Sequence, residues 1–210
     1  MIVWVLILAN VLVSMKGFND ESFFRKYQFD VGRIQSGEKI RMVSSAFLHA
    51  DLMHLAFNMI ALYSFAPVVT SMFGDIIFII IYLASLFFGS ILTMVFHGKD
   101  YAYKAVGASG AVTGIIYSAI LLYPDMTILI FGIIPMPAYL FGIGYLLYSI
   151  YGMKAKNDNI GHTAHFGGAI GGYVITLLME PALLEQSTFM VILLAVPIII
   201  LFVMAKTGKL

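Results

Sequence analysis

The stretch Val106-Gly107-Ala108-Ser109-Gly110-Ala111-Val112-Thr113-Gly114 opens an apolar run that continues to Tyr123. It places a serine between two glycines in the first turn of a predicted membrane helix. Serine is common at close helix–helix contacts in membranes, where its hydroxyl bonds back to the backbone, so Ser109 alone indicates only packing. The polar residues of two other predicted helices suggest a chemical role for it.

The composition is that of an all-α polytopic membrane protein. Of the 210 residues, 61% are hydrophobic and 11% are charged, whereas soluble domains carry about 25% charged residues. The net charge of +1 gives no indication of nucleic acid as a partner, and the lack of cysteine excludes disulfides, thiolate metal sites and a cysteine nucleophile. The 19 glycines favour helices that pack with their backbones close together.

Seven apolar segments are within reach of the roughly 20 residues that cross a bilayer. They are residues 1–15, 46–70, 76–96, 106–123, 127–150, 163–182 and 188–205. The first segment has no charged n-region, so we interpret it as a membrane helix and not as a signal peptide. Pro135 and Pro137 predict a kink or break in the fifth segment. The charged and aromatic residues between positions 16 and 45 predict an ordered loop at the membrane interface.

The second, fourth and sixth segments enter the membrane from the same side and carry polar residues near that entry. The second has His49, His54 and Asn58, the fourth has Ser109, and the sixth has His165. His54 and Asn58 are four residues apart and therefore share one helix face. Polar and ionisable side chains are costly within a membrane and mark a functional site by default.

Two ridges of small residues predict which helices meet. In each ridge a small residue recurs at every fourth position. The fourth segment has Gly110, Gly114 and Ser118, and the sixth has Ala164, Gly168 and Gly172. Such ridges let two backbones nearly touch. If the ridges pack together, Ser109 and His165 lie at matching depth and within hydrogen-bonding reach.

A serine beside a histidine base is an activated nucleophile. Asn58 and His54 would then donate side-chain hydrogen bonds to a developing oxyanion, together with the backbone N–H of Ser109. This chemistry requires water, which a shallow site that opens to the entry side could provide.

Other interpretations of the same residues stay open at this point. Each histidine taken alone could be a buried packing residue, and His49, His54 and His165 together could bind a metal ion. The metal site would leave Ser109 without a role. A transporter could also carry polar residues within the membrane, near its midplane. The polar residues of this chain are instead shallow and confined to one side, which argues against a transporter. The histidines at 97 and 162 are predicted to be solvated loop residues, and Tyr145 a packing or interface residue.

The three motifs, in this order, resemble those of the rhomboid intramembrane serine proteases. Gly107-Ala108-Ser109-Gly110 resembles the family's G-x-S-G motif. The spacing of His49, His54 and Asn58 resembles H-x4-H-x3-N, and Ala164-His165 with Gly168 and Gly172 resembles A-H-x2-G-x3-G. The resemblance extends from Arg41 to Gly172.

The resemblance implies a serine protease that cuts transmembrane segments of other membrane proteins within the lipid bilayer. Ser109 would be the nucleophile and His165 the base, in a dyad without a carboxylate, metal ion or organic cofactor. Asn58, His54 and Ser109 would bind the oxyanion. The residues that would support this site are His49, Gly107, Gly110, Gly168 and Arg41. A catalytically silent relative that only binds membrane clients is the alternative.

The resemblance also implies an organisation of the chain. Residues 1–182 would form a six-helix core, with the first loop at about 16–45, and residues 183–210 would add one C-terminal transmembrane helix. The fifth helix and residues 151–162 would form a mobile gate. We expect a multi-pass protein of the cell membrane, and the sequence does not indicate an oligomeric state.

The chain departs from the family pattern in several places. Ile40 replaces a tryptophan, Thr70 replaces a glutamate, and Thr113 replaces a tyrosine that stacks on the catalytic histidine. In addition, all 12 basic residues lie on the side where the site opens. The positive-inside rule predicts that this side is cytoplasmic, whereas the family resemblance implies the outside, which we adopt.

Overall fold

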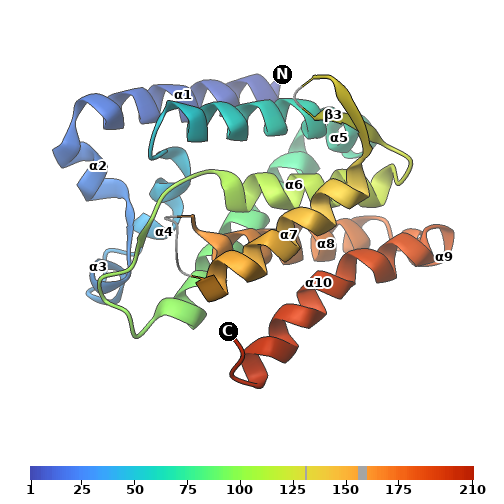
Figure 1. Ribbon diagram of the computed structural model, residues 1–210. Helices are drawn as coiled ribbons and strands as arrows, with labels where there is room; N and C mark the ends of the chain where they lie inside the picture. Colours follow the sequence, from blue (N-terminus) through green and yellow to red (C-terminus); the bar gives the residue numbers. More distant parts are fainter. Residues whose placement is uncertain (131, 156–159) are drawn as a thin grey trace.

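The computed structural model describes residues 1–130, 132–155 and 160–210 (Figure 1). Helices dominate these residues, with two short antiparallel strand pairs, which confirms the predicted all-α polytopic membrane fold. The elements are α1 (Ile2–Asn19), α2 (Glu21–Tyr27), β1 (Phe29–Asp30), α3 (Val31–Gln35), α4 (Arg41–Ser44), η1 (Ser45–Phe47), α5 (Leu52–His97), β2 (Lys104–Ala105), α6 (Ser109–Leu122), β3 (Thr127–Ile130), β4 (Ile134–Pro137), α7 (Ala138–Ala155), α8 (His162–Met179), α9 (Leu183–Gln186) and α10 (Thr188–Lys206).

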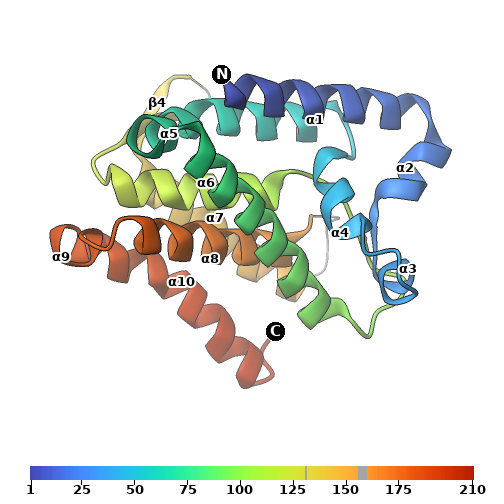
Figure 2. The same cartoon turned by 180° about the vertical axis from the view of Figure 1, so that it is seen from behind.

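The helix α5 contains two membrane crossings. Its 46 residues would extend about 69 Å as one straight helix, more than twice the roughly 30 Å hydrocarbon core of a bilayer. At Gly74 the backbone adopts φ 75° and ψ 175°, a conformation that suits glycine, and the helix turns back there (Figure 2). This confirms the predicted separation of the second and third apolar segments.

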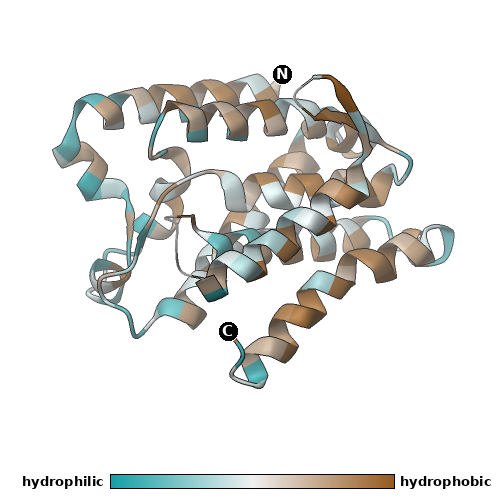
Figure 3. Ribbon diagram, viewed as in Figure 1, coloured by the Kyte–Doolittle hydropathy of each residue, from teal (hydrophilic) through white to brown (hydrophobic). Residues whose placement is uncertain are grey.

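The helix α6 is the centre of the bundle. Every residue from 110 to 121 is buried, because the helices α5 and α8 pack around it. The helices α1, α5 and α10 are long and apolar enough to cross a membrane. Apolar residues run along α1 and α10, whereas polar residues gather around α2 and the loops at the same end of the molecule (Figure 3).

The two predicted ridges of small residues do meet. A Cβ atom added at Gly168 would collide with the carbonyl oxygen of Gly110, and one at Gly172 would collide with that of Gly114. A Cβ at Gly114 would also overlap the hydroxyl of Ser85 on the second half of α5. Glycine is therefore required at these positions because the helix backbones are in direct contact.

The fifth apolar segment differs from the prediction. The predicted break at Pro135 and Pro137 is present, but the residues before it form a hairpin of β3 and β4 and not a helix, so α7 begins only at Ala138. Pro135 and Pro137 lack the backbone N–H groups that a helix interior needs, and the isoleucines around them favour strands. Gly132, with φ 73°, forms the turn. The N-terminal helix is also longer than the predicted 1–15.

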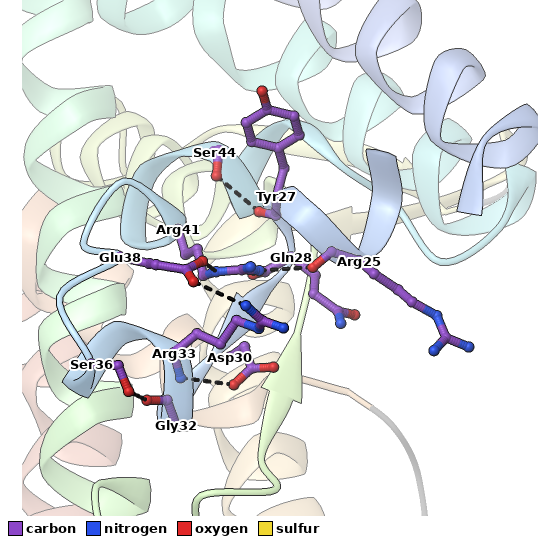
Figure 4. A network of polar contacts seen from close by, with 10 residues as sticks. All are labelled: Arg25, Tyr27, Gln28, Asp30, Gly32, Arg33, Ser36, Glu38, Arg41 and Ser44. Atoms are coloured by element: carbon purple, nitrogen blue, oxygen red, sulfur yellow. Dashed lines mark hydrogen bonds and ion pairs between the residues drawn. The ribbon is translucent and has the colours of Figure 1, made fainter. Parts of the chain in front are cut away.

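The first loop is ordered, as predicted (Figure 4). The guanidinium of Arg41, only 2% exposed, donates to Glu38 at 2.7 Å and to the carbonyl oxygens of Arg25 and Gln28 at 2.8 and 3.0 Å. Arg33 donates to the same carboxylate at 3.0 Å. Hydrogen bonds from Arg41 and Arg33 lower the pKa of Glu38. Arg41 thus holds this loop together through three hydrogen bonds.

Candidate active site

The chain reaches Ser109 through a turn that only glycine can form. Gly107 has φ 126°, and a Cβ atom there would lie 2.6 Å from Cε1 of His54. The backbone N–H of Gly107 donates to the carbonyl of Ser45 at 3.0 Å. This turn presents Ser109, which is half-buried, as the first residue of α6.

Ser109 and His165 are in contact, as the ridge argument predicted. The Oγ atom of Ser109 lies 2.9 Å from Nε2 of His165, which is buried in α8. The packing of Gly110 against Gly168 accounts for this contact, because Gly110 directly follows Ser109 and Gly168 lies about one turn after His165. The close backbone contact therefore sets the distance between the two polar groups.

The second helix brings its polar residues to the same place. The imidazole of His54 lies against Gly107, next to the serine. Asn58 lies one turn further into the membrane, is 5% exposed, and donates one amide hydrogen to the carbonyl of His54 at 2.9 Å. Its Nδ2 atom carries a second hydrogen that can be donated elsewhere. Asp51 caps this helix by accepting from the backbone N–H of His54 at 2.7 Å.

His49 connects α1 to the residue before the serine. It is fully buried, and burial together with the neighbouring His54 lowers the pKa of His49 to about 3. The ring is therefore neutral at pH 7. Its Nε2 accepts from the backbone N–H of Ala108 at 3.4 Å, so its Nδ1–H donates to the hydroxyl of Ser14 at 2.8 Å. The Ser14 hydroxyl in turn donates to the carbonyl of Phe47 at 3.0 Å.

This neutral histidine predicts acid sensitivity. Its pKa falls from 6.5 to about 3 on folding, so between these pH values only the unfolded chain binds the proton. The free energy of unfolding should therefore fall as the pH drops below about 6.5. In detergent, the thermal midpoint of His49→Gln should fall less between pH 7.5 and 5 than that of the wild type, because glutamine does not titrate. Parallel curves for the two proteins would contradict this assignment.

Two residues of α7 complete the surroundings of His165, and the sequence interpretation missed both. The hydroxyl of Tyr145 lies 3.0 Å from Nε2 of His165, and that of Ser149 lies 3.1 Å from Nδ1. The rings of Tyr145 and His165 lie 4.8 Å apart with an interplanar angle of 31°. Tyr145 was predicted to be a packing or interface residue, and the contact of its hydroxyl with His165 was not foreseen. Its spacing of four from Ser149 was the available signal, since it puts both on one helix face.

Two histidines predicted to be solvated are instead packed. His97 stacks on Tyr103 with ring centroids 3.9 Å apart and hydrogen-bonds the hydroxyl of Thr163 at 2.8 Å. His162 is 4% exposed, because the absence of a side chain at Gly152 lets α7 approach it closely. The predicted gate at residues 151–162 includes 156–159, which lie outside the described residues.

The alternative metal site does not form. Within residues 1–130, 132–155 and 160–210, no three His, Asp or Glu side chains are grouped so that they could hold a metal ion. His49, His54 and His165 are thus not arranged as a three-histidine site. The arrangement is suited instead to proton transfer between Ser109 and His165, with donors from the second helix beside them.

Comparison with known proteins decides the family. The sequence matches the Rhomboid domain family over residues 36–182, which is more than half of the chain and contains Ser109, His165 and the polar residues of α5 and α7 beside them. The chain belongs to the rhomboid family. This family membership agrees with the resemblance of the three motifs.

Several rhomboid proteins are similar to this rhomboid over much of its length. RHOMBOID-like protein 12, mitochondrial, of Arabidopsis thaliana is 32% identical over 181 residues, which are 78% of this chain and 54% of the relative. The Putative rhomboid protease YdcA of Bacillus subtilis is 32% identical over 147 residues, 69% of each chain. Rhomboid protease GluP of the same organism is 35% identical over 144 residues, 67% of this chain and 26% of GluP.

The chain thus spans about half of the Arabidopsis relative and about a quarter of GluP. This rhomboid is an integral membrane protein by its apolar helices and its family. Because the Arabidopsis relative is named as mitochondrial, the predicted location in a cell membrane stays a prediction.

Proposed function

We propose that this rhomboid hydrolyses peptide bonds in, or just outside, the transmembrane segments of other membrane proteins. The observation that supports the proposal most directly is the 2.9 Å distance between Oγ of Ser109 and Nε2 of His165. This is the separation at which a base can take the proton of a nucleophile. The relatives named as proteases, YdcA and GluP, support the same reaction class.

In the proposed reaction, Nε2 of His165 takes the hydroxyl proton while Oγ of Ser109 attacks the carbonyl carbon of the scissile bond. The backbone N–H of Ser109 and the side chains of His54 and Asn58 would donate to the oxyanion. His165 then gives its proton to the leaving amine, which departs and leaves an acyl-enzyme. Water, deprotonated by the same histidine, releases the carboxylic acid and regenerates the serine.

The proposed substrate must unwind before it can be cut. A helix hides its carbonyl groups in internal hydrogen bonds, so helix-breaking residues near the cut should favour cleavage. Small residues beside the cut would suit the crowded surroundings of Gly107 and Gly110. No metal ion or organic cofactor enters these steps. The supporting roles of His49, Gly168 and Arg41, and the division into residues 1–182 and 183–210, belong to the same proposal.

A silent rhomboid that binds membrane clients without cutting is the second candidate. Because Ser109 and His165 are both present and in contact, this candidate explains less of the structure. A transporter explains neither the contact nor the glycine turn that presents the serine.

A fluorophosphonate probe, which phosphonylates activated serines, tests the proposal. The detergent-solubilised wild-type protein should be labelled, and His165→Ala should not be labelled. Labelling of Asn58→Ala should be slower by about 10- to 1,000-fold if its amide binds the oxyanion. A wild-type protein that is folded by its thermal midpoint but stays unlabelled would favour the silent client-binding protein.

A further inference from the structure

The helix α7 places two hydroxyl groups on the two ring nitrogens of His165. Ser149 lies 3.1 Å from Nδ1, on the side of the ring that faces away from the nucleophile. Tyr145, one helical turn earlier, lies 3.0 Å from Nε2, the nitrogen that also contacts Ser109 at 2.9 Å. The imidazole is therefore positioned by α7 as well as by its own helix.

The chemistry of a neutral imidazole makes the Nδ1 contact important. The ring carries one hydrogen, and Nε2 can act as a base only if that hydrogen is on Nδ1. A buried N–H group without an acceptor is costly, so the tautomer with Nδ1–H is favoured where an acceptor is present. The hydroxyl oxygen of Ser149 is such an acceptor, and its side chain is fully buried.

We propose that Ser149 is the positioning residue of the dyad. It accepts a hydrogen bond from Nδ1–H of His165 and thereby keeps Nε2 unprotonated and directed at Ser109. In serine hydrolases with a triad, a carboxylate performs this task. Here a neutral hydroxyl performs it, which avoids the cost of a charge buried in the membrane. This inference rests on the proposed function.

Tyr145 has a different part in the same arrangement. Its ring packs against the imidazole at 4.8 Å, from a different helix than Thr113, where the family pattern has a stacking tyrosine. Its hydroxyl competes with the hydroxyl of Ser109 for the one lone pair of Nε2.

The test uses fluorophosphonate labelling of the full-length protein in detergent, with the inactivation rate constant kinact and the probe affinity KI measured separately. Ser149→Ala should lower kinact by about 10- to 100-fold and leave KI unchanged, as expected for the loss of one buried hydrogen bond. Ser149→Thr, which keeps the hydroxyl, should restore most of the rate. Ser118→Ala, which removes a buried hydroxyl that bonds Thr176 at 2.7 Å, is the matched control and should be labelled at the rate of the wild type.

A second measurement reports on the tautomer directly and applies even if a variant does not fold. In protein labelled with ¹⁵N-histidine, the chemical shifts of His165 should be those of an Nδ1–H ring in the wild type and should change in Ser149→Ala. The inference would be overturned by an Nε2–H ring in the wild type, or by a folded Ser149→Ala with the kinact of the wild type. In either case, labelling of the wild type would still support the proposed function. Failure to label the wild type would instead count against the proposed function.

Discussion

Ser109→Ala is expected to abolish cleavage of a membrane substrate without loss of the fold. The attacking oxygen comes from this side chain, which lies 2.9 Å from Nε2 of His165 and stands at the start of α6 beside His54 and Gly107. Removal of a nucleophile from a dyad should lower the rate by about 10⁴-fold or more. The assay would use proteoliposomes with a single-span reporter whose transmembrane segment contains alanine, glycine and serine followed by a helix-breaking residue.

The alanine variant should retain the thermal midpoint of the wild type to within a few degrees, because the change removes one half-buried oxygen atom. Ser118→Ala is a useful control, since this serine lies on the same helix and bonds Thr176 at 2.7 Å, away from His165. It should retain cleavage. Cleavage by Ser109→Ala at the rate of the wild type would reject Ser109 as the nucleophile.

Gly168→Ala is expected to have the largest effect on stability. The added methyl group would collide with the backbone carbonyl of Gly110, which cannot move without a shift of the whole helix α6. Overpacking of this kind costs about 1–3 kcal/mol, and more where backbone must move. The thermal midpoint in detergent should therefore fall clearly, and activity should fall with it because the same contact sets the distance from Ser109 to His165.

Gly144→Ala provides the matched control for this change. No heavy atom lies within 4 Å of the position of its added Cβ, and the residue is in the exposed face of α7. The substitution should be neutral or slightly stabilising, because alanine favours a helix more than glycine does. Equal midpoints for the wild type, Gly168→Ala and Gly144→Ala would mean that α6 and α8 do not pack through the glycine ridges.

The parts of the site that follow from local patterns could be predicted from the sequence. The four-residue spacing of small residues predicted that α6 packs against α8. Because backbones in close contact can align in only a few ways, the same spacing predicted that Ser109 meets His165. The spacing of His54 and Asn58 likewise placed both on one helix face. The family match agrees with these motifs.

The parts that depend on the start and rotation of α7 could not be predicted. Hydropathy does not separate an apolar hairpin from an apolar helix, so the strands before Ala138 were missed, and with them the position at which the helix begins. The four-residue spacing of Tyr145 and Ser149 puts both on one helix face, but without that start it did not show that this face meets α8. Tyr145 and Ser149 therefore looked like ordinary packing residues until the structure placed them against His165.

The short length of α6 has a consequence for the lipid. The helix has 14 residues, about 21 Å of rise, whereas the hydrocarbon layer is about 30 Å thick. It can be this short because protein, and not lipid, surrounds it on all sides. If its far end reaches one membrane surface, its first residue lies about 9 Å below the other. The thickness of the host bilayer, set by acyl-chain length, would then determine how far water must descend to reach the serine.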